Sequence, residues 1–206
     1  MQLLSGVGTY ATALILEITN VEAENLFILA LVLCLSFSFT LTFIIALFYL
    51  RNDFSQRHPE ASGLVPSVLW VIIGVFLTIF VQTIAITIES WFGIEAGSEN
   101  TEQLLSVIAQ MPQFVIVIII LGPVLEEIVF RKIIFSYLYD RYNIWISALL
   151  SACIFALAHM ELEHFLLYTG IGLVFTFLYY KTKRILVPIA AHILMNAFVV
   201  IDSFFF

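Results

Sequence analysis

Three apolar segments of this chain carry acidic, basic, imidazole or amide side chains at helical spacing. The six residues are Glu126, Glu127, Arg131, His159, His192 and Asn196. Carboxylates and imidazoles can accept and return protons, and imidazole or amide donors can stabilise a developing oxyanion. The set therefore points to acid–base chemistry inside or beside a membrane.

The acidic pair Glu126 and Glu127 lies within an apolar helix rather than at its end. Counting from the loop at Arg141, with a rise of about 1.5 Å per residue, places Glu126 roughly 20 Å from the nearer membrane surface. Charges at that depth are costly unless they are paired. Glu127 and Arg131 have i,i+4 spacing with the acid first, which favours a helical ion pair. We expect Glu126 to be a general base, whereas the alternative is a buried pair that only fixes helix packing.

The two histidines come from different segments. His159 follows fifteen apolar residues, which places it about 22 Å deep and level with Glu126. His192 and Asn196 share one face of their helix because they have i,i+4 spacing. Counting from Ile185 gives His192 a depth of only about 10 Å, which does not match the other two groups. The alternatives are an interfacial His159 and a packing hydrogen bond at Asn196.

Composition defines the class of protein that holds these groups. The chain has 206 residues, of which 62% are hydrophobic and 11% charged, and a mean hydropathy of +1.09. These values exclude an ordinary soluble domain and indicate an integral membrane protein. Eight Lys and Arg residues are too few and too scattered for a phosphate-binding groove, which argues against nucleic acid as a partner. Cys34 and Cys153 lie in apolar runs, so we expect no disulfide.

Uncharged runs predict an all-α, polytopic bundle of six transmembrane helices with a catalytic cavity between them. The predicted helices are Leu26–Leu50, Leu64–Ile88, Leu104–Leu125, Ile144–Ala158, Phe165–Tyr180 and Ile185–Ile201. Residues 1–16 are short for a span, and they would add a seventh helix if they inserted. Residues 1–110 hold no motif and residues 111–206 hold all three, within one compact membrane domain.

The charges of the loops predict the orientation. Lys and Arg occur in the first, third and fifth loops, and the alternate loops carry Glu without any Lys or Arg. The basic residues of these loops are Arg51, Arg57, Arg141, Lys181, Lys183 and Arg184. Because basic loops stay in the cytoplasm, the pattern predicts six crossings with both termini outside. We expect the membrane to be a prokaryotic plasma membrane.

The three motifs together resemble a known family. Glu126-Glu127-x-x-x-Arg131, Phe155-x-x-x-His159 and His192-x-x-x-Asn196 are similar to the signature motifs of the CAAX-protease and bacteriocin-processing membrane proteins, also called CPBP or Abi. The resemblance covers about Gly122 to Phe198. Lys132 departs from the pattern, because family members commonly have Gly there, but it replaces no group expected to be catalytic.

The resemblance implies an intramembrane endopeptidase whose substrate is a membrane peptide or protein, prenylated CAAX-like or bacteriocin-like. Glu126 would activate water with the help of His159, and Glu127 with Arg131 would support the site. His192 and Asn196 would stabilise the oxyanion or orient the substrate. We expect no cofactor, although the family has been classed as metalloprotease and Glu126, His159 and His192 could instead bind zinc.

Two other function classes use the same residues. In a non-enzymatic immunity or regulatory protein, the same residues would have only a structural role. An ion-coupled transporter also needs intramembrane Glu and His. The absence of inverted repeats and the small number of helices weaken the transporter reading. We therefore favour the peptidase.

Overall fold

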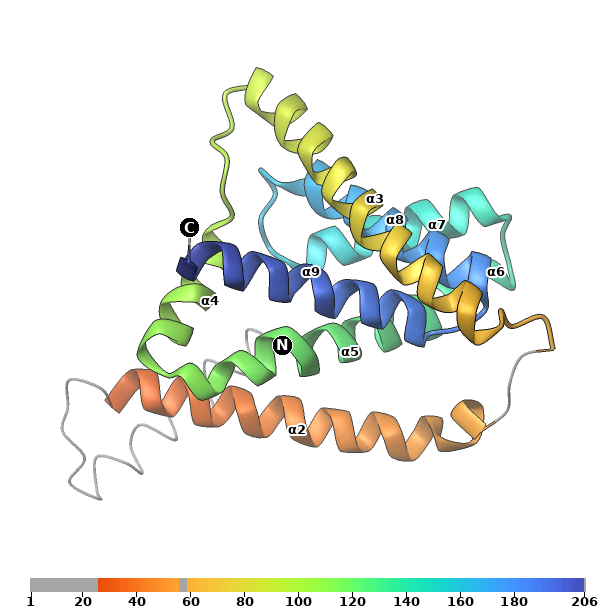
Figure 1. Ribbon diagram of the computed structural model, residues 1–206, viewed down its shortest axis with the longest axis horizontal. Coiled ribbons are helices and arrows are strands. Elements are labelled where there is room, and N and C mark those ends of the chain that lie inside the picture. Colours follow the sequence, from red (N-terminus) through yellow and green to blue (C-terminus); the bar gives the residue numbers. More distant parts are fainter. Residues whose placement is uncertain (1–25, 56–58, 206) are drawn as a thin grey trace.

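The computed structural model describes residues 26–55 and 59–205, and this part of the chain is helical with no strand (Figure 1). A continuous helix, Pro112–Tyr139, contains α5 and α6 and is called here the motif helix. The remaining helices are α2 (Leu26–Ser55), α3 (Leu64–Trp91), α4 (Glu99–Gln110), α7 (Ile144–Ala158), α8 (Phe165–Thr182) and α9 (Leu186–Phe205). The all-α polytopic membrane bundle predicted from the sequence is confirmed.

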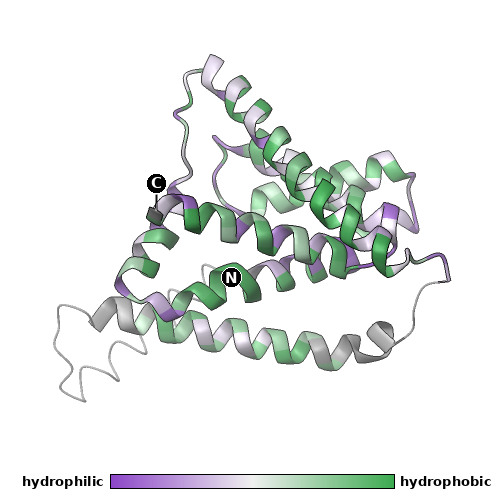
Figure 2. Cartoon of the chain, in the orientation of Figure 1, coloured by the Kyte–Doolittle hydropathy of each residue, from purple (hydrophilic) through white to green (hydrophobic). Residues whose placement is uncertain are grey.

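Four of these helices are long and apolar enough to cross a membrane by length and composition, namely Leu64–Trp91, Pro112–Tyr139, Phe165–Thr182 and Leu186–Phe204. Two apolar helical stretches are shorter, Val32–Ala46 within α2 and Ile144–Ala158. Apolar residues cover the helices, whereas the polar residues concentrate in the connections (Figure 2). The count of six crossings stays a prediction, and the possible span in residues 1–16 lies outside the described residues.

One predicted helix is wrong in its bounds. The uncharged run Leu104–Leu125 is not a single helix, because α4 ends at Gln110 and the motif helix begins at Pro112. Pro112 has no amide hydrogen and therefore cannot continue the ladder of α4, but it is tolerated in the first turn of a new helix. Ser98 caps α4 because its side chain accepts the Thr101 amide. The connection expected between the second and third predicted helices therefore contains the first turn of α4.

The motif helix is irregular on both sides of its glutamates. Residues Val117–Leu121 and Ile128–Phe135 form π-helical turns, and α5 (Gly122–Glu127) lies between them. Such turns leave carbonyl groups outside the regular ladder, and they are frequent at functional sites. Ser151 of α7 donates to the Phe130 carbonyl at 2.8 Å. The π turns therefore both place the glutamates and offer carbonyls to neighbouring helices.

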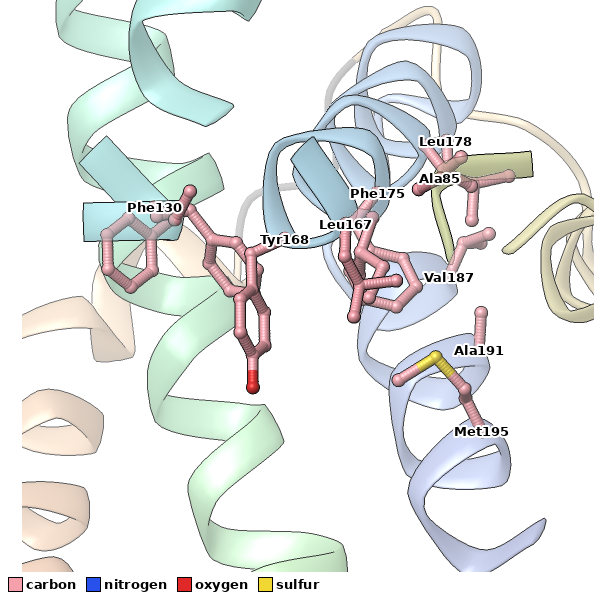
Figure 3. Close-up of a cluster of buried hydrophobic side chains, with 13 residues drawn as sticks. Ala85, Phe130, Leu167, Tyr168, Phe175, Leu178, Val187, Ala191 and Met195 are labelled. Atoms are coloured by element: carbon pink, nitrogen blue, oxygen red, sulfur yellow. The ribbon is translucent and has the colours of Figure 1, made fainter. Parts of the chain in front are cut away.

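α8 is the centre of the bundle, packed against α3, α7 and α9. A cluster of buried side chains from α3, the motif helix and α7–α9 surrounds it, and most of them are labelled in Figure 3. Gly172 lets α8 lie close to the backbone of α7, because a Cβ atom there would lie 3.1 Å from both Cα and Cβ of Ala152.

The loops gather at two ends of the bundle (Figure 1). At the end called here the basic end, residues 59–63, 139–143 and 183–185 meet: the Ser62 amide donates to Thr182, and the Lys183 ammonium lies 5.6 Å from the ring centre of Tyr139. Residues 92–98 and 159–164 form the acidic end. The alternation of loop charge along the sequence therefore corresponds to a separation in space.

Candidate active site

The ion pair expected between Glu127 and Arg131 is present and fully buried. The Nη1 atom of Arg131 lies 3.1 Å from Oε1 of Glu127, and both side chains are at most 1% exposed. The Nη2 atom donates to the Gly172 carbonyl at 3.2 Å. The guanidinium carbon lies 4.5 Å from the ring centre of Phe155 and 5.4 Å from that of Phe175. The buried guanidinium is thus stabilised by two aromatic rings and a backbone carbonyl as well as by the carboxylate.

Glu127 also binds His192, which the sequence analysis did not anticipate. The Nδ1 atom of His192 lies 3.0 Å from Oε1 of Glu127, the oxygen that pairs with Arg131. Because a carboxylate only accepts hydrogen bonds, Nδ1 carries the hydrogen and Nε2 faces away from Glu127. The imidazole also stacks on Phe175 at 4.7 Å between ring centres, which fixes the plane of the ring.

Glu126 lies beside the same imidazole in a more open position. Its Oε2 atom is 3.9 Å from Nε2 of His192, too far for a direct hydrogen bond. The Glu126 side chain is 35% exposed, whereas that of Glu127 is 0% exposed. The two adjacent carboxylates therefore have different surroundings, as the spacing predicts: Glu127 is enclosed by its partners and Glu126 is partly exposed.

His159 joins the cluster through Phe155. Its Nδ1 atom lies 2.8 Å from the Phe155 carbonyl, so Nδ1 is the donor and Nε2 is left to act. The ring centre of Phe155 is 4.6 Å from that of His159 and 6.4 Å from that of His192. The two imidazoles therefore flank one phenylalanine, and Glu126 lies against the second of them.

Asn196 makes the interhelical hydrogen bond that was the alternative to a catalytic role. Its Nδ2 atom donates to the Ile118 carbonyl at 3.3 Å. In this π turn the Gly122 amide bonds to Val117, so the next amide would bond to Ile118, but that residue is Pro123 and has no N–H. Asn196 therefore satisfies a carbonyl that proline leaves open, and the amide retains a second hydrogen for other contacts.

The depth mismatch of His192 disappears in the structure, because this histidine contacts Glu127 directly. The rise of 1.5 Å per residue applies to an α-helix. Ile128–Phe135 is π-helical, has more residues per turn and therefore rises less per residue. The sequence count therefore places the glutamates too far from the basic end.

The residues proposed as zinc ligands do not form a three-ligand site. Within residues 26–55 and 59–205, no three His, Cys, Asp or Glu side chains are placed to hold a metal ion. The Nδ1 atoms of both histidines are engaged, that of His192 by Glu127 and that of His159 by the Phe155 carbonyl, so the Nε2 atoms are the ones available for other contacts. The arrangement suits proton transfer and hydrogen-bond donation.

A second buried pair lies at the acidic end, where the sequence analysis passed over both partners. Nδ1 of His164 lies 2.9 Å from Oε2 of Glu89, and the other oxygen of Glu89 accepts the Leu167 amide at 3.0 Å. Burial lowers the pKa of His164, but hydrogen bonds to Glu89 and to the Gly97 backbone, with the nearby acidic charges, raise it above its usual value overall. The sequence does contain one indication of this pair. The loops of the acidic end have no Lys or Arg, so a histidine is the side chain there that can pair with a buried Glu89.

The helical membrane fold and the three motifs are those expected of a membrane peptidase of the CAAX-protease type, and comparisons with known proteins support this class. Residues 108–198 match the family described as type II CAAX prenyl endopeptidase, Rce1-like. The chain is 47% identical over 167 residues to the protein named membrane peptidase YdiL of Bacillus subtilis, an alignment that covers 80% of this chain and 68% of that protein. It is 37% identical over 139 residues to the membrane-embedded CAAX protease MroQ of Staphylococcus aureus, an alignment that covers 64% of this chain and 56% of that protein. No solved structure matches.

The chain therefore belongs to the Rce1-like CAAX prenyl endopeptidase family. The resemblance stated from the three motifs is confirmed, and all six motif residues lie within the matched segment.

Proposed function

We propose that this chain is a multi-pass endopeptidase of a bacterial plasma membrane that hydrolyses a peptide bond with water activated by Glu126. The relatives are named as membrane peptidases of bacteria, which supports the class and the setting. The family description names CAAX prenyl endopeptidases, so a prenylated chain end is one substrate to test and a bacteriocin-like peptide is the other.

The observation that carries the proposal is the contrast between the two adjacent glutamates. Glu127 is fully buried and holds both Arg131 and the Nδ1 atom of His192. Glu126 is partly exposed and lies 3.9 Å from Nε2 of the same imidazole. A purely structural motif has no need of a second carboxylate that is kept beside an oriented imidazole, because an uncompensated charge within the membrane is costly.

In the proposed reaction, Glu126 accepts a proton from water while the water oxygen attacks the carbonyl carbon of the scissile bond. The resulting oxyanion accepts hydrogen bonds from Nε2–H of His192, in its protonated form, and from the second Nδ2 hydrogen of Asn196. When the C–N bond breaks, Glu126 returns its proton to the leaving nitrogen. Water is thereby divided between the new carboxyl and amino termini.

The other motif residues support these steps. Glu127 accepts the Nδ1 hydrogen of His192 and so fixes the direction of Nε2, and the ion pair with Arg131 holds Glu127 in place. His159 presents Nε2, because its Nδ1 is bound to the Phe155 carbonyl. It would assist Glu126 in holding the attacking water.

The test is cleavage of membrane-inserted peptides by the purified protein in proteoliposomes, read by mass spectrometry of the products. A prenylated peptide and a matched unprenylated peptide distinguish the two substrate types. The glutamate mechanism expects cleavage that persists in the presence of a chelator and does not vary with the metal content of the preparation. Loss of cleavage with the chelator, restored by added zinc, would contradict it.

A further inference from the structure

Tyr168 of α8 makes a close contact with His159 that no motif predicts. The two rings stack with centres 3.9 Å apart and planes 24° apart. The tyrosine is 8% exposed and belongs to the buried cluster around α8 (Figure 3). Phe155 also contacts His159: its carbonyl accepts the Nδ1 hydrogen, and its ring packs against the imidazole. Two aromatic side chains therefore set the plane of the imidazole.

The hydroxyl of Tyr168 is held by polar groups of the acidic end, among them Glu161 and Ser98. It donates to Oε2 of Glu161 at 3.1 Å, and it lies 2.9 Å from Oγ of Ser98. Since a phenol has one hydrogen, which goes to the carboxylate, the Ser98 hydroxyl must donate to the Tyr168 oxygen. Ser98 in turn accepts the Thr101 amide at 3.1 Å. Each hydrogen in this chain of contacts has an acceptor, so the far end of the ring is fixed.

The same contacts attach α4 to α8. Oε1 of Glu161 accepts the Asn100 amide, in the first turn of α4. A carboxylate at the start of a helix is favoured by the helix dipole and by the amides that have no partner within the helix. Glu161 thus binds α4 with one oxygen and Tyr168 with the other, and Tyr168 carries the connection to His159.

We propose that Tyr168 is a positioning residue for His159, held in register by Glu161 and Ser98 at the start of α4. The inference rests on the proposed function, in which His159 assists Glu126. Tyr168 does not meet the substrate. It acts by keeping the imidazole plane, and therefore the direction of Nε2, in the reactive orientation, and small errors in such an orientation are costly in rate.

Three substitutions separate the parts of this role. Tyr168→Leu removes the stacked ring, Tyr168→Phe keeps the ring but loses the hydroxyl, and Glu161→Gln keeps a neutral acceptor. Tyr142→Leu, an exposed tyrosine at the basic end, is the matched control. The first readout is the NMR spectrum of the full chain in detergent with isotope-labelled histidine. A His159→Gln variant assigns the His159 signals among the four histidines.

The NMR measurement does not depend on activity. A proton that lies over the face of an aromatic ring is shifted upfield, so the carbon-bound protons of His159 should move downfield in Tyr168→Leu and stay at the wild-type position in Tyr142→Leu. Tyr168→Phe and Glu161→Gln should broaden or partly shift these signals, because the Tyr168 ring stays in place but is held less firmly.

The second readout is the rate of peptide cleavage. Tyr168→Leu should lower kcat by about tenfold or more with KM changed by less than about twofold, since positioning acts on the chemical step. Tyr168→Phe, which keeps the ring but loses its hydroxyl contacts, should recover part of the lost rate and stay below the wild-type value. If Tyr168→Leu does not fold, the signals of Tyr168→Phe and Glu161→Gln decide the question, because a wild-type spectrum and rate in both would overturn the role of the Glu161 contact.

An unchanged His159 spectrum in a folded Tyr168→Leu, or a changed spectrum with an unchanged kcat, would overturn the inference. If the wild-type protein cleaves no membrane peptide, the proposed function fails. In that event a downfield shift in Tyr168→Leu would still show that Tyr168 orients His159.

Discussion

The Nδ1 atom of His192 lies 3.0 Å from Oε1 of Glu127, although 65 residues separate them in the chain. The same oxygen receives the guanidinium of Arg131 at 3.1 Å. One carboxylate therefore holds a cation on its own helix and an imidazole on α9. Because carboxylate, guanidinium and imidazole are all buried, the loss of any one of them should disturb the other two.

Glu127→Gln should be strongly destabilising. The substitution leaves Arg131 as a buried cation without its carboxylate, a loss on the order of 3–5 kcal/mol for a fully buried pair. Thermal unfolding in detergent measures it, and the matched control is Glu126→Gln at the adjacent, partly exposed position. Equal unfolding temperatures for the two variants would contradict the assignment of Glu127 as structural support.

Gly172→Ala should destabilise the contact between α7 and α8. The new Cβ would lie 3.1 Å from Cα of Ala152, which belongs to the backbone of α7 and cannot move alone. Overpacking of this kind costs about 1–3 kcal/mol, which outweighs the higher helix propensity of alanine. Gly63→Ala is the control, because its Cβ would meet only ordinary contacts at 3.5 Å or more. A Gly172→Ala protein as stable as Gly63→Ala would show that the helices separate without cost.

The Glu89–His164 pair should make stability depend on pH. The pKa of His164 is raised in the folded protein, so its charged form stabilises the fold. This contribution is complete below the unfolded value of about 6.5 and is lost as the pH rises through the folded value. The difference in unfolding temperature between wild type and His164→Gln should therefore shrink as the pH rises from about 6.5 through the raised folded value. A difference that stays constant over this range would contradict a charged His164.

Much of this architecture could be predicted from the sequence, because charge in an apolar helix is costly and so demands a partner. The Glu127–Arg131 pair and the separate surroundings of Glu126 follow from spacing on one helix. The hydrogen bond from His192 to Glu127 does not, because it depends on how π turns rotate and shorten the motif helix. The end of α4 was missed because the run stays uncharged across Met111 and Pro112, whereas the helical hydrogen bonding is interrupted there. Tyr168 carries no motif, and only the packing of α7 against α8 places it on His159.

The two ends of the bundle should face opposite sides of the membrane. In a background with Cys34 and Cys153 replaced by Ser, Glu95→Cys at the acidic end should react with an impermeant thiol reagent in intact cells. Glu60→Cys at the basic end should react only after permeabilisation, because basic loops stay in the cytoplasm. Both positions are exposed, so access to the reagent depends on the side of the membrane. Labelling of Glu60→Cys from outside would reverse the orientation.

The central claim is that Glu126 activates the water, and cleavage of a membrane-inserted peptide by purified Glu126→Gln protein tests it most directly. The substitution nearly preserves size and removes only the base, at a side chain whose approach to His192 is 3.9 Å and not a direct hydrogen bond. The unfolding temperature should therefore stay at the wild-type value while cleavage falls by a factor of about 10² to 10⁴. A Glu126→Gln protein that folds normally and cleaves the peptide at the wild-type rate would contradict the claim.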